Sequence, residues 1–169
     1  MESFKNEVIQ ELPDINQVDF TKINKDYFKV ILINFFLYFI PLLITLIILD
    51  LYVFSDDIKA YQILIFTSFF IFFGAILLYI ILMFPLRMYS VRDKDISYKS
   101  GLFFRTLTTV PFSRIQHVEI DEGPISRVFK LASISVYTAG DSSDDLIIKG
   151  IKREKALQIK EFISTKVND

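Results

Sequence analysis

The chain has 169 residues, of which 52% are hydrophobic and 15% aromatic, and its formal net charge is −1. A balance this close to neutral gives no general attraction for nucleic acid, so we expect no nucleic-acid partner. The absence of cysteine excludes disulfides, thiol nucleophiles and cysteine-ligated metals.

The first 26 residues form a polar segment with scattered apolar positions, interrupted by Pro13. This pattern predicts a cytoplasmic amphipathic segment over residues 1–26, made of a short helix, a turn and a second short helix. Its apolar positions would lie on the membrane surface or against the rest of the protein. A partly ordered tail is the alternative interpretation. Tyr27, Phe28 and Lys29 follow as an interface anchor before a long apolar run.

Residues 27–86 contain two charge-free apolar runs, at about residues 30–49 and 61–84, both rich in Ile, Leu and Phe. At about 1.5 Å per residue, roughly 20 apolar residues in a helix cross a hydrocarbon core of about 30 Å. The sequence therefore predicts a two-helix transmembrane hairpin. The first run is longer than the apolar region of a signal peptide, which has about 7–15 residues, so we expect both helices in the mature protein.

Polar residues inside the two runs are few and uncharged. Asn34 and Thr45 are expected to bond across to the second helix, where Ser68, Gly74 and Ala75 permit close approach. No residue in either run is ionisable, which disfavours a conduit for a substrate or an ion.

The charges beside the two runs predict the orientation. The connector, Asp50–Lys59, holds three acids and one lysine, whereas basic residues precede the first run and follow the second: Lys22, Lys25, Lys29, Arg87, Arg92 and Lys94. By the positive-inside rule, both termini are expected in the cytoplasm, with only the short connector outside.

Residues 87–169 change from a helical to an alternating pattern. The pattern predicts a short helical piece at about residues 125–131 and strands at about residues 86–91, 96–99, 102–110, 115–121, 133–138 and 146–148. Gly150 is expected to break the chain before an amphipathic helix over residues 152–167. The predicted fold class is a membrane α-helical hairpin joined to an α+β domain, a small antiparallel sheet with a C-terminal helix.

Many residues of this region match a family pattern in combination: Arg87, Tyr89, Val91, Asp93, Ile96, Gly101, Arg105, Pro111, Arg114, Ile115, Gln116, Val118, Gly123, Pro124, Arg127, Phe129, Leu131, Ala132, Val136, Thr138, Ala139, Gly140 and Gly150. With the two preceding runs, nearly the whole chain resembles the bacterial pleckstrin-homology (PH) family of the membrane-flanked, YdbS-like type. The resemblance implies a PH-like, partly open antiparallel barrel, closed by the C-terminal helix and held against the cytoplasmic face of the bacterial inner membrane. It also implies a larger relative with several copies of the domain. Lys130 departs from the pattern, which more often has glycine there.

No arrangement in the sequence is typical of an enzyme. His117 is the only histidine, and a sheet position is favoured over a metal ligand because no second histidine or cysteine could share the ion. The acidic run Asp141–Asp145 has the composition of a cation-binding loop but not its spacing. Phosphate loops, catalytic triads and zinc-protease helices do not occur. We therefore expect no enzymatic activity, no cofactor and no metal.

The strongest candidates for partner binding are polar residues around one predicted strand, Arg114, Gln116 and Arg127. They would form a guanidinium-lined patch for a carboxylate of a protein partner or for a lipid phosphate. The alternative is that Arg114 or Arg127 pairs internally with one of the nearby acids, Glu119, Asp121 and Glu122.

A second candidate set, for lipid headgroups, is the basic cluster Lys149, Lys152, Arg153 and Lys155. In eukaryotic PH domains, a basic loop between early strands holds phosphoinositides. The turn at that place here, Arg92–Asp95, is not a candidate because its acids cancel its bases.

These observations favour a non-enzymatic, membrane-anchored interaction module whose PH-like domain binds a protein partner, with a multi-copy relative as one candidate. PH-like barrels bind peptides along an exposed edge. One alternative is an accessory subunit of a transport or envelope-defence assembly that acts through its membrane hairpin. A further alternative is direct binding of anionic lipid.

Overall fold

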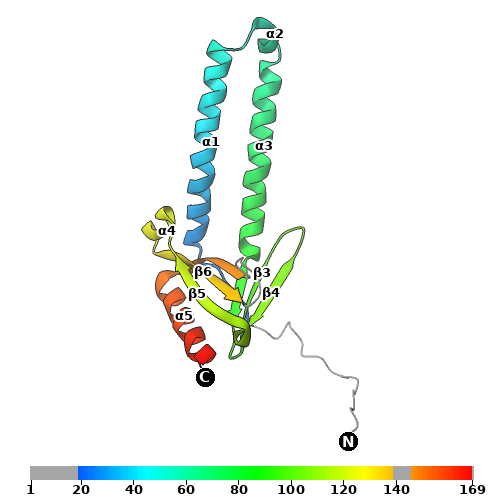
Figure 1. Cartoon of the computed structure of the whole chain (residues 1–169). Coiled ribbons are helices and arrows are strands. Elements are labelled where there is room, and N and C mark those ends of the chain that lie inside the picture. The colour runs from blue at the N-terminus through cyan, green and yellow to red at the C-terminus, as the bar shows by residue number, and fades with distance from the viewer. Residues whose placement is uncertain (1–18, 139–145, 169) are drawn as a thin grey trace, which may run out of the picture.

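The computed structural model describes residues 19–138 and 146–168. Two long helices, α1 (Asp26–Tyr52) and α3 (Gln62–Met83), stand side by side on a small sheet domain (Figure 1). A short helix, α2 (Asp56–Lys59), lies in the connector at their far end, and the 3-10 turn η2 (Phe84–Leu86) leads from α3 to the sheets. Both long helices are apolar over a length that can cross a membrane, and the rest of the protein covers neither. Helices apolar on every side need an apolar surrounding, which the bilayer provides.

Aromatic side chains join the two helices. Phe39 lies 5.6 Å from Phe69 and 5.1 Å from Phe73, measured between ring centroids, and at the domain end Phe28 lies 5.2 Å from Phe84. Such ring pairs prefer the tilted and edge-to-face geometries found here. Packing of rings therefore joins the two helices at the domain end and in the middle of the hairpin.

The two polar residues expected to bond across the hairpin bond within their own helix instead. Asn34 Nδ2 donates to the Val30 carbonyl and Thr45 Oγ1 to the Pro41 carbonyl, each at 2.9 Å. A carbonyl four residues back lies within reach of both side chains, so this local bond is made without the second helix.

The far end of the hairpin differs from the prediction. Helix α1 continues past residue 49 to Tyr52, so the structure places Asp50 inside the first helix, buried against the second. Gln62 Nε2, at the start of α3, donates to Asp50 Oδ2 at 2.9 Å. The predicted run, which ends at residue 49, contains no charge, and the helix carries this acid just beyond it, with Oδ2 bonded to Gln62 and Oδ1 without a partner among the described residues.

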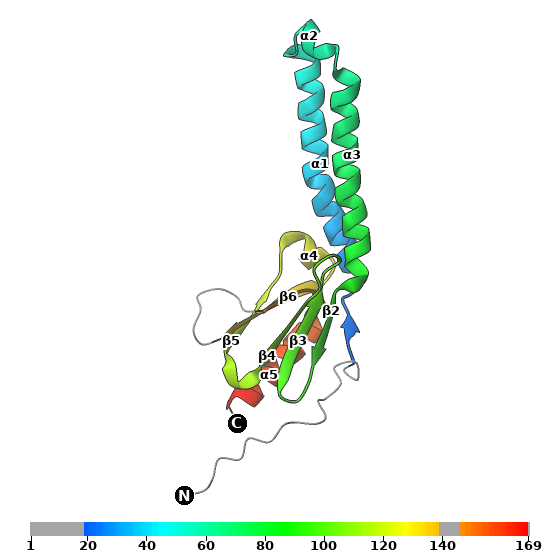
Figure 2. The ribbon, with the colours of Figure 1, turned by 90° about the vertical axis from the view of Figure 1, so that its right-hand side faces the viewer.

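The sheet domain consists of two antiparallel sheets. The first has the strand order β1 (Thr21–Lys22), β2 (Met88–Val91), β3 (Asp95–Ser100) and β4 (Thr106–Pro111). The second has the order β5 (Ile115–Asp121), β6 (Leu131–Thr138) and β7 (Leu146–Lys152). The 3-10 turn η3 (Phe112–Arg114) joins the sheets, α4 (Pro124–Val128) joins β5 to β6, and α5 (Arg153–Asn168) packs against the second sheet (Figure 2).

The described end of the N-terminal segment, from residue 19 to α1, contains a strand and no helix. Thr21 pairs with Tyr89 and Lys22 with Met88, so this segment is an edge strand of the first sheet. The first helix expected in the N-terminal segment lies outside the described residues, as does the acidic run 141–145. Pairing with β2, which follows both membrane helices in sequence, decides the local structure here.

Glycine positions account for two further differences from the predicted strands. Gly101 has φ +110°, and β4 begins only at Thr106, because the chain turns tightly between β3 and β4. Gly150 does not end its strand, since β7 continues to Lys152. It has φ +83° beside a register shift in β6, and an added Cβ would lie 2.3 Å from Cγ of Tyr27. The glycine thus allows a strand to continue directly under the start of α1.

The core lies between the two sheets and α5. Its fully buried side chains include Ile96, Ile134, Val136, Ile148 and Ile163. Ala156, Ile159 and Ile163 form the apolar side of α5 that faces this core, as the amphipathic pattern predicts. The predicted fold class, two apolar helices followed by antiparallel sheets and a C-terminal helix, is confirmed.

Candidate basic interface site and sheet edge

Four basic side chains gather beside the membrane end of the domain, and we call them the basic hollow: Arg127, Lys130, Lys152 and Arg153. A cavity of about 490 Å³ is lined by Asp26, Phe129, Lys130, Lys152, Arg153 and Glu154. A second cavity of about 570 Å³ adjoins it, and Arg127 and Glu122 take part in its lining. Because Asp26 is the first residue of α1, the basic hollow lies where the chain enters its first membrane helix.

Backbone bonds bring these residues together from two distant segments. Helix α4 ends at Val128, and Lys130 takes φ +54°, the left-handed conformation in which helices commonly end. The Lys130 N–H donates to the Arg127 carbonyl at 3.0 Å, and the Arg153 N–H donates to the Lys130 carbonyl at 3.0 Å. The end of α4 is thereby tied to the start of α5.

The charges of the basic hollow are partly compensated. Arg153 Nε lies 2.6 Å from Glu122 Oε1, and Arg127 Nε lies 4.0 Å from Glu122 Oε2. Lys130 and Lys152 take part in no salt bridge within the described part of the chain. With Lys29 and Asp26 of α1 included, five basic residues face three carboxylates: Lys29, Arg127, Lys130, Lys152 and Arg153 against Asp26, Glu122 and Glu154. The surplus favours an anion.

The predicted patch of Arg114, Gln116 and Arg127 is not a single surface. Arg114 and Gln116 lie at the start of β5, whereas Arg127 lies in α4, after β5 has ended. A seven-residue strand is about 23 Å long, so the two ends cannot contact the same small group. Arg127 is 74% exposed and only at the limit of ion-pair distance from Glu122, whose close partner is Arg153.

The predicted lipid cluster is also divided. All four side chains are exposed, but only Lys152 and Arg153 line the basic hollow. Lys155 lines a separate groove between the first sheet and α5, and Lys149 projects from β7 and lines none of the cavities described here. Lys130 was missed by the sequence reasoning, although a lysine where a helix-ending glycine is usual was the available signal.

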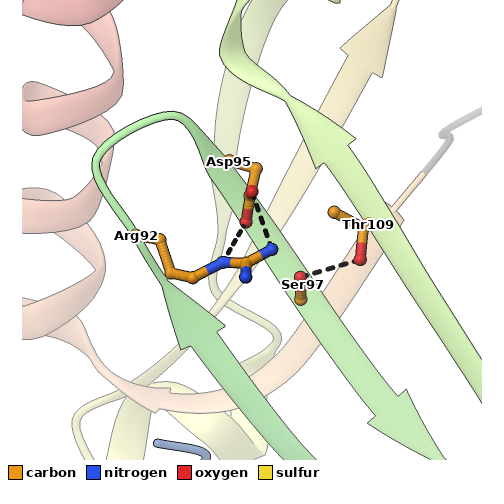
Figure 3. Close-up of polar contacts among 4 residues, drawn as sticks. All are labelled: Arg92, Asp95, Ser97 and Thr109. Atoms are coloured by element: carbon orange, nitrogen blue, oxygen red, sulfur yellow. Dashed lines mark hydrogen bonds and ion pairs between the residues drawn. The ribbon is translucent and has the colours of Figure 1, made fainter. Parts of the chain in front are cut away.

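The turn between β2 and β3 holds its own charges together. Arg92 Nε and Nη2 donate to the two carboxylate oxygens of Asp95, each at 2.7 Å, and Ser97 and Thr109 share a 2.8 Å hydroxyl bond between β3 and β4 (Figure 3). A two-bond fork of this kind occupies the guanidinium. Arg92 is therefore engaged by Asp95 instead of facing a phosphate.

Strand β4 is an open edge. It is the last strand of the first sheet, and no other strand among the described residues pairs with its outer side. Its residues, Thr-Leu-Thr-Thr-Val-Pro, include no charge. Alternate residues of an antiparallel strand direct their N–H and C=O groups outward, so this edge offers backbone donors and acceptors.

His117 lies on the exposed side of β5. Its ring stacks on Tyr137 at 4.2 Å, and Nε2 lies 3.6 Å from Glu119 Oε1. Among residues 19–138 and 146–168, no group of three or more His, Asp or Glu side chains is arranged to hold a metal ion.

A family model described as "Bacterial PH domain" matches residues 30–167, which include the membrane hairpin and nearly all of the sheet domain. The chain belongs to the bacterial PH domain family. This bacterial PH domain protein thus carries the family pattern across both of its parts, as the sequence resemblance implied.

Two relatives from Bacillus subtilis are similar to this bacterial PH domain protein. The UPF0699 transmembrane protein YdbS is 32% identical over 76 residues, which cover 45% of this chain and 46% of YdbS. The UPF0699 transmembrane protein YdbT is 28% identical over 79 residues, which cover 46% of this chain and 16% of YdbT. The aligned part therefore spans less than half of YdbS and a small share of the much longer YdbT.

A solved structure is also similar, a DUF1696 family protein with a pleckstrin-homology domain from Shewanella loihica. It has a TM-score of 0.39 and 15% identity, over 48% of this chain and 70% of that one. Because the relatives are described as transmembrane proteins and this chain has two candidate spans, this bacterial PH domain protein is a membrane protein. The descriptions of the family and the relatives indicate no catalytic family.

Proposed function

We propose that this protein is a non-enzymatic, membrane-anchored interaction module. The hairpin holds the PH-like domain at the cytoplasmic face of the bacterial inner membrane, and the domain binds a protein partner. The observation that carries this proposal is the open, uncharged edge of β4.

Natural sheets protect exposed edges with charged side chains, prolines, bulges or very short strands, because an open edge pairs with other chains. Strand β4 is six residues long, has no charged residue and has a proline only at its last position. It is thus poorly protected against pairing. A partner segment that adds as a further strand would satisfy its outward backbone groups, as in other cases of strand addition.

We further propose that the partner is a longer membrane protein of the same family. The similarity to two proteins of one organism, of which one is much longer than the other, supports a pair of related proteins in one membrane. In this chain the sheets directly follow the second membrane helix, and a relative built in the same way would carry its domains at the same depth. That arrangement would bring strand edges together without a long connecting linker.

The experiment compares two exposed leucines of the same domain. Leu107 of β4 is 40% exposed and Leu157 of α5 is 45% exposed. Leu107→Lys and Leu157→Lys therefore introduce the same charge with a similar loss of folding stability. Each full-length variant is purified from native membranes in mild detergent, and its content of the long relative is measured. Loss of the relative with Leu107→Lys alone supports strand addition at β4, and equal content in both variants refutes it.

A cross-link adds a direct readout. The chain has no cysteine, so Thr106→Cys provides one thiol beside the β4 edge. A thiol-directed photoreactive label at this position should cross-link to the relative, whereas the same label on a Leu157→Cys variant should not.

A second candidate is binding of anionic lipid at the basic hollow, favoured by Lys130 and Lys152, which lack salt-bridge partners in the described chain. A basic residue near an anionic membrane surface contributes about 1 kcal/mol. Short-chain phosphatidylglycerol should therefore raise the melting temperature more than phosphatidylcholine does, and added salt should remove the difference. The double change Lys130→Ala and Lys152→Ala should abolish it and Lys149→Ala should not, whereas stabilisation that ignores salt and headgroup contradicts this role.

The hairpin itself would be the working part if the protein were an accessory subunit of a transport or envelope-defence assembly. Buried Asp50 is the observation that favours this alternative, since a carboxylate within a membrane helix is costly and often functional. Replacing the hairpin with an unrelated two-helix anchor separates the cases. Partner binding that survives the exchange supports the module, and its loss supports the hairpin.

A further inference from the structure

The loop between β3 and β4, residues 101–105, carries the most exposed aromatic side chains of the sheet domain, and we call it the hairpin tip. Phe103 is 80% exposed and Phe104 is 90% exposed. Leu102 precedes them and Arg105 follows, so three consecutive apolar residues end at one charge. A Cβ on Gly101 would lie 1.8 Å from the Phe104 carbonyl oxygen, so only glycine permits this tight turn, which presents both rings outward.

The hairpin tip lies beside the membrane helix and not beside the core. Figures 1 and 2 show the β3–β4 loop rising along the lower end of α3. The ring of Phe103 is nearly parallel to that of Tyr79 in α3, with 6° between the planes and 6.4 Å between the centroids. The aromatic surface of the tip is therefore continuous with the apolar surface of α3.

The depth of this contact can be estimated along α3. Phe84, at the end of the helix, contacts Phe28, which is next to Lys29, so this level lies near the membrane boundary. Tyr79 is five residues further into the membrane helix, or about 7.5 Å at 1.5 Å per residue. Apolar side chains of interfacial segments enter the headgroup and acyl boundary by about 5–10 Å. Phe103, beside Tyr79, would lie at that depth if the boundary is at the level of Phe84.

We propose that the hairpin tip inserts into the phospholipid bilayer beside α3. Leu102, Phe103 and Phe104 occupy the boundary between headgroups and acyl chains, and Arg105 extends to the lipid phosphates along its apolar stem. The domain then has a third membrane attachment besides α1 and α3. This attachment prevents the sheet domain from tilting about the domain ends of the two membrane helices. This role is independent of the partner-binding edge, although β4 begins where the tip ends.

Because the chain contains no tryptophan, Phe103→Trp and Phe104→Trp each place a single indole in the tip. Each full-length variant is reconstituted alone in phosphatidylcholine–phosphatidylglycerol vesicles. Lipids brominated either near the headgroup or near the end of the acyl chain then quench the fluorescence according to depth. The control, Val167→Trp, lies in the last turn of α5, whose C-terminal end points away from the membrane helices (Figure 1).

For both tip variants we expect fluorescence emission at a shorter wavelength than that of the control. We also expect the lipid brominated near the headgroup to quench this emission more strongly than the lipid brominated near the end of the acyl chain does. The two positions are independent tests, since both side chains are exposed and either substitution alone can report the depth. Emission like that of Val167→Trp, with no quenching by either lipid, overturns the proposal. A blue shift without quenching also overturns it, because it places the indole against protein, such as a second copy of the chain.

Discussion

Gly150→Ala is expected to loosen the contact between the sheet domain and the first membrane helix. The added Cβ would lie 2.3 Å from Tyr27 Cγ and 2.7 Å from Ile23 Cγ2, and φ at this position is +83°. The Asn24 N–H also donates to the Gly150 carbonyl at 3.1 Å, which limits how far the strand can move away. Both strain and overlap therefore act at this residue.

The left-handed conformation costs a non-glycine residue about 1–2 kcal/mol, and overpacking of a core adds about 1–3 kcal/mol. A total near 3 kcal/mol lowers the melting temperature of a domain of this size by roughly 12–24 °C. The assay is thermal unfolding of the purified full-length protein in detergent, followed by circular dichroism in the range of the sheet signal. Gly123→Ala serves as control, because no atom lies within 4 Å of the added Cβ and φ is not positive there.

A second background separates the two costs. In a Tyr27→Ala variant the overlap with the ring is removed and the overlap with Ile23 Cγ2 remains, so Gly150→Ala should cost less than in the wild type but no less than about 1–2 kcal/mol, the conformational part. If the Gly150→Ala variant has the same melting temperature as the Gly123→Ala variant, the reasoning is refuted altogether. An equal cost in both backgrounds refutes the part that concerns the Tyr27 ring.

Three further outcomes follow from buried groups. Ile134→Ala removes a fully buried core side chain and should cost about 2–5 kcal/mol in urea unfolding, so a change below about 1 kcal/mol would contradict the position of the core. Asp50→Ala leaves the Gln62 amide without its 2.9 Å partner and should weaken the hairpin by about 1–3 kcal/mol in unfolding by sodium dodecyl sulfate, with a smaller loss for Asp50→Asn. Burial raises the pKa of the Tyr89 hydroxyl above its ordinary value, so the folded protein keeps a proton that the unfolded chain loses. The stability from this group is complete below about pH 10 and is lost as the pH rises toward the pKa of the folded state. Tyr89→Phe should flatten this alkaline decline of the melting temperature in a series of melting curves. An unchanged decline would assign the loss of stability to other groups.

The membrane helices and most strands could be predicted because their signals are local. Long charge-free runs determine α1 and α3, and period-two alternation marks the strands. Helix α1 extends past the predicted run to Tyr52, where Gln62 donates to Asp50 Oδ2 across the hairpin and Asp50 Oδ1 has no partner among the described residues. Strand β1 could not be predicted, since two residues contain no periodicity and its partner β2 follows both helices.

The candidate site was predicted only in part for the same reason. Lys152 and Arg153 were chosen for their closeness in sequence to other cations, and they do line the basic hollow. Lys130 joins them through backbone bonds between the end of α4 and the start of α5, a contact that no local pattern contains. Conversely, Arg114 and Arg127 looked close in sequence, yet the length of β5 separates them.

The pairing of β1 with β2 links folding of the sheet to insertion of the helices. Thr21 and Lys22 leave the ribosome before α1, and their partners Tyr89 and Met88 leave it after α3. In the proposed membrane arrangement, the first sheet can close only when α1 and α3 have crossed the same bilayer in opposite directions, which returns the chain to its starting side. A molecule whose second helix failed to insert would leave both the edge of β2 and Ile23 exposed. Incorrect membrane topology would therefore show itself as an incompletely folded domain.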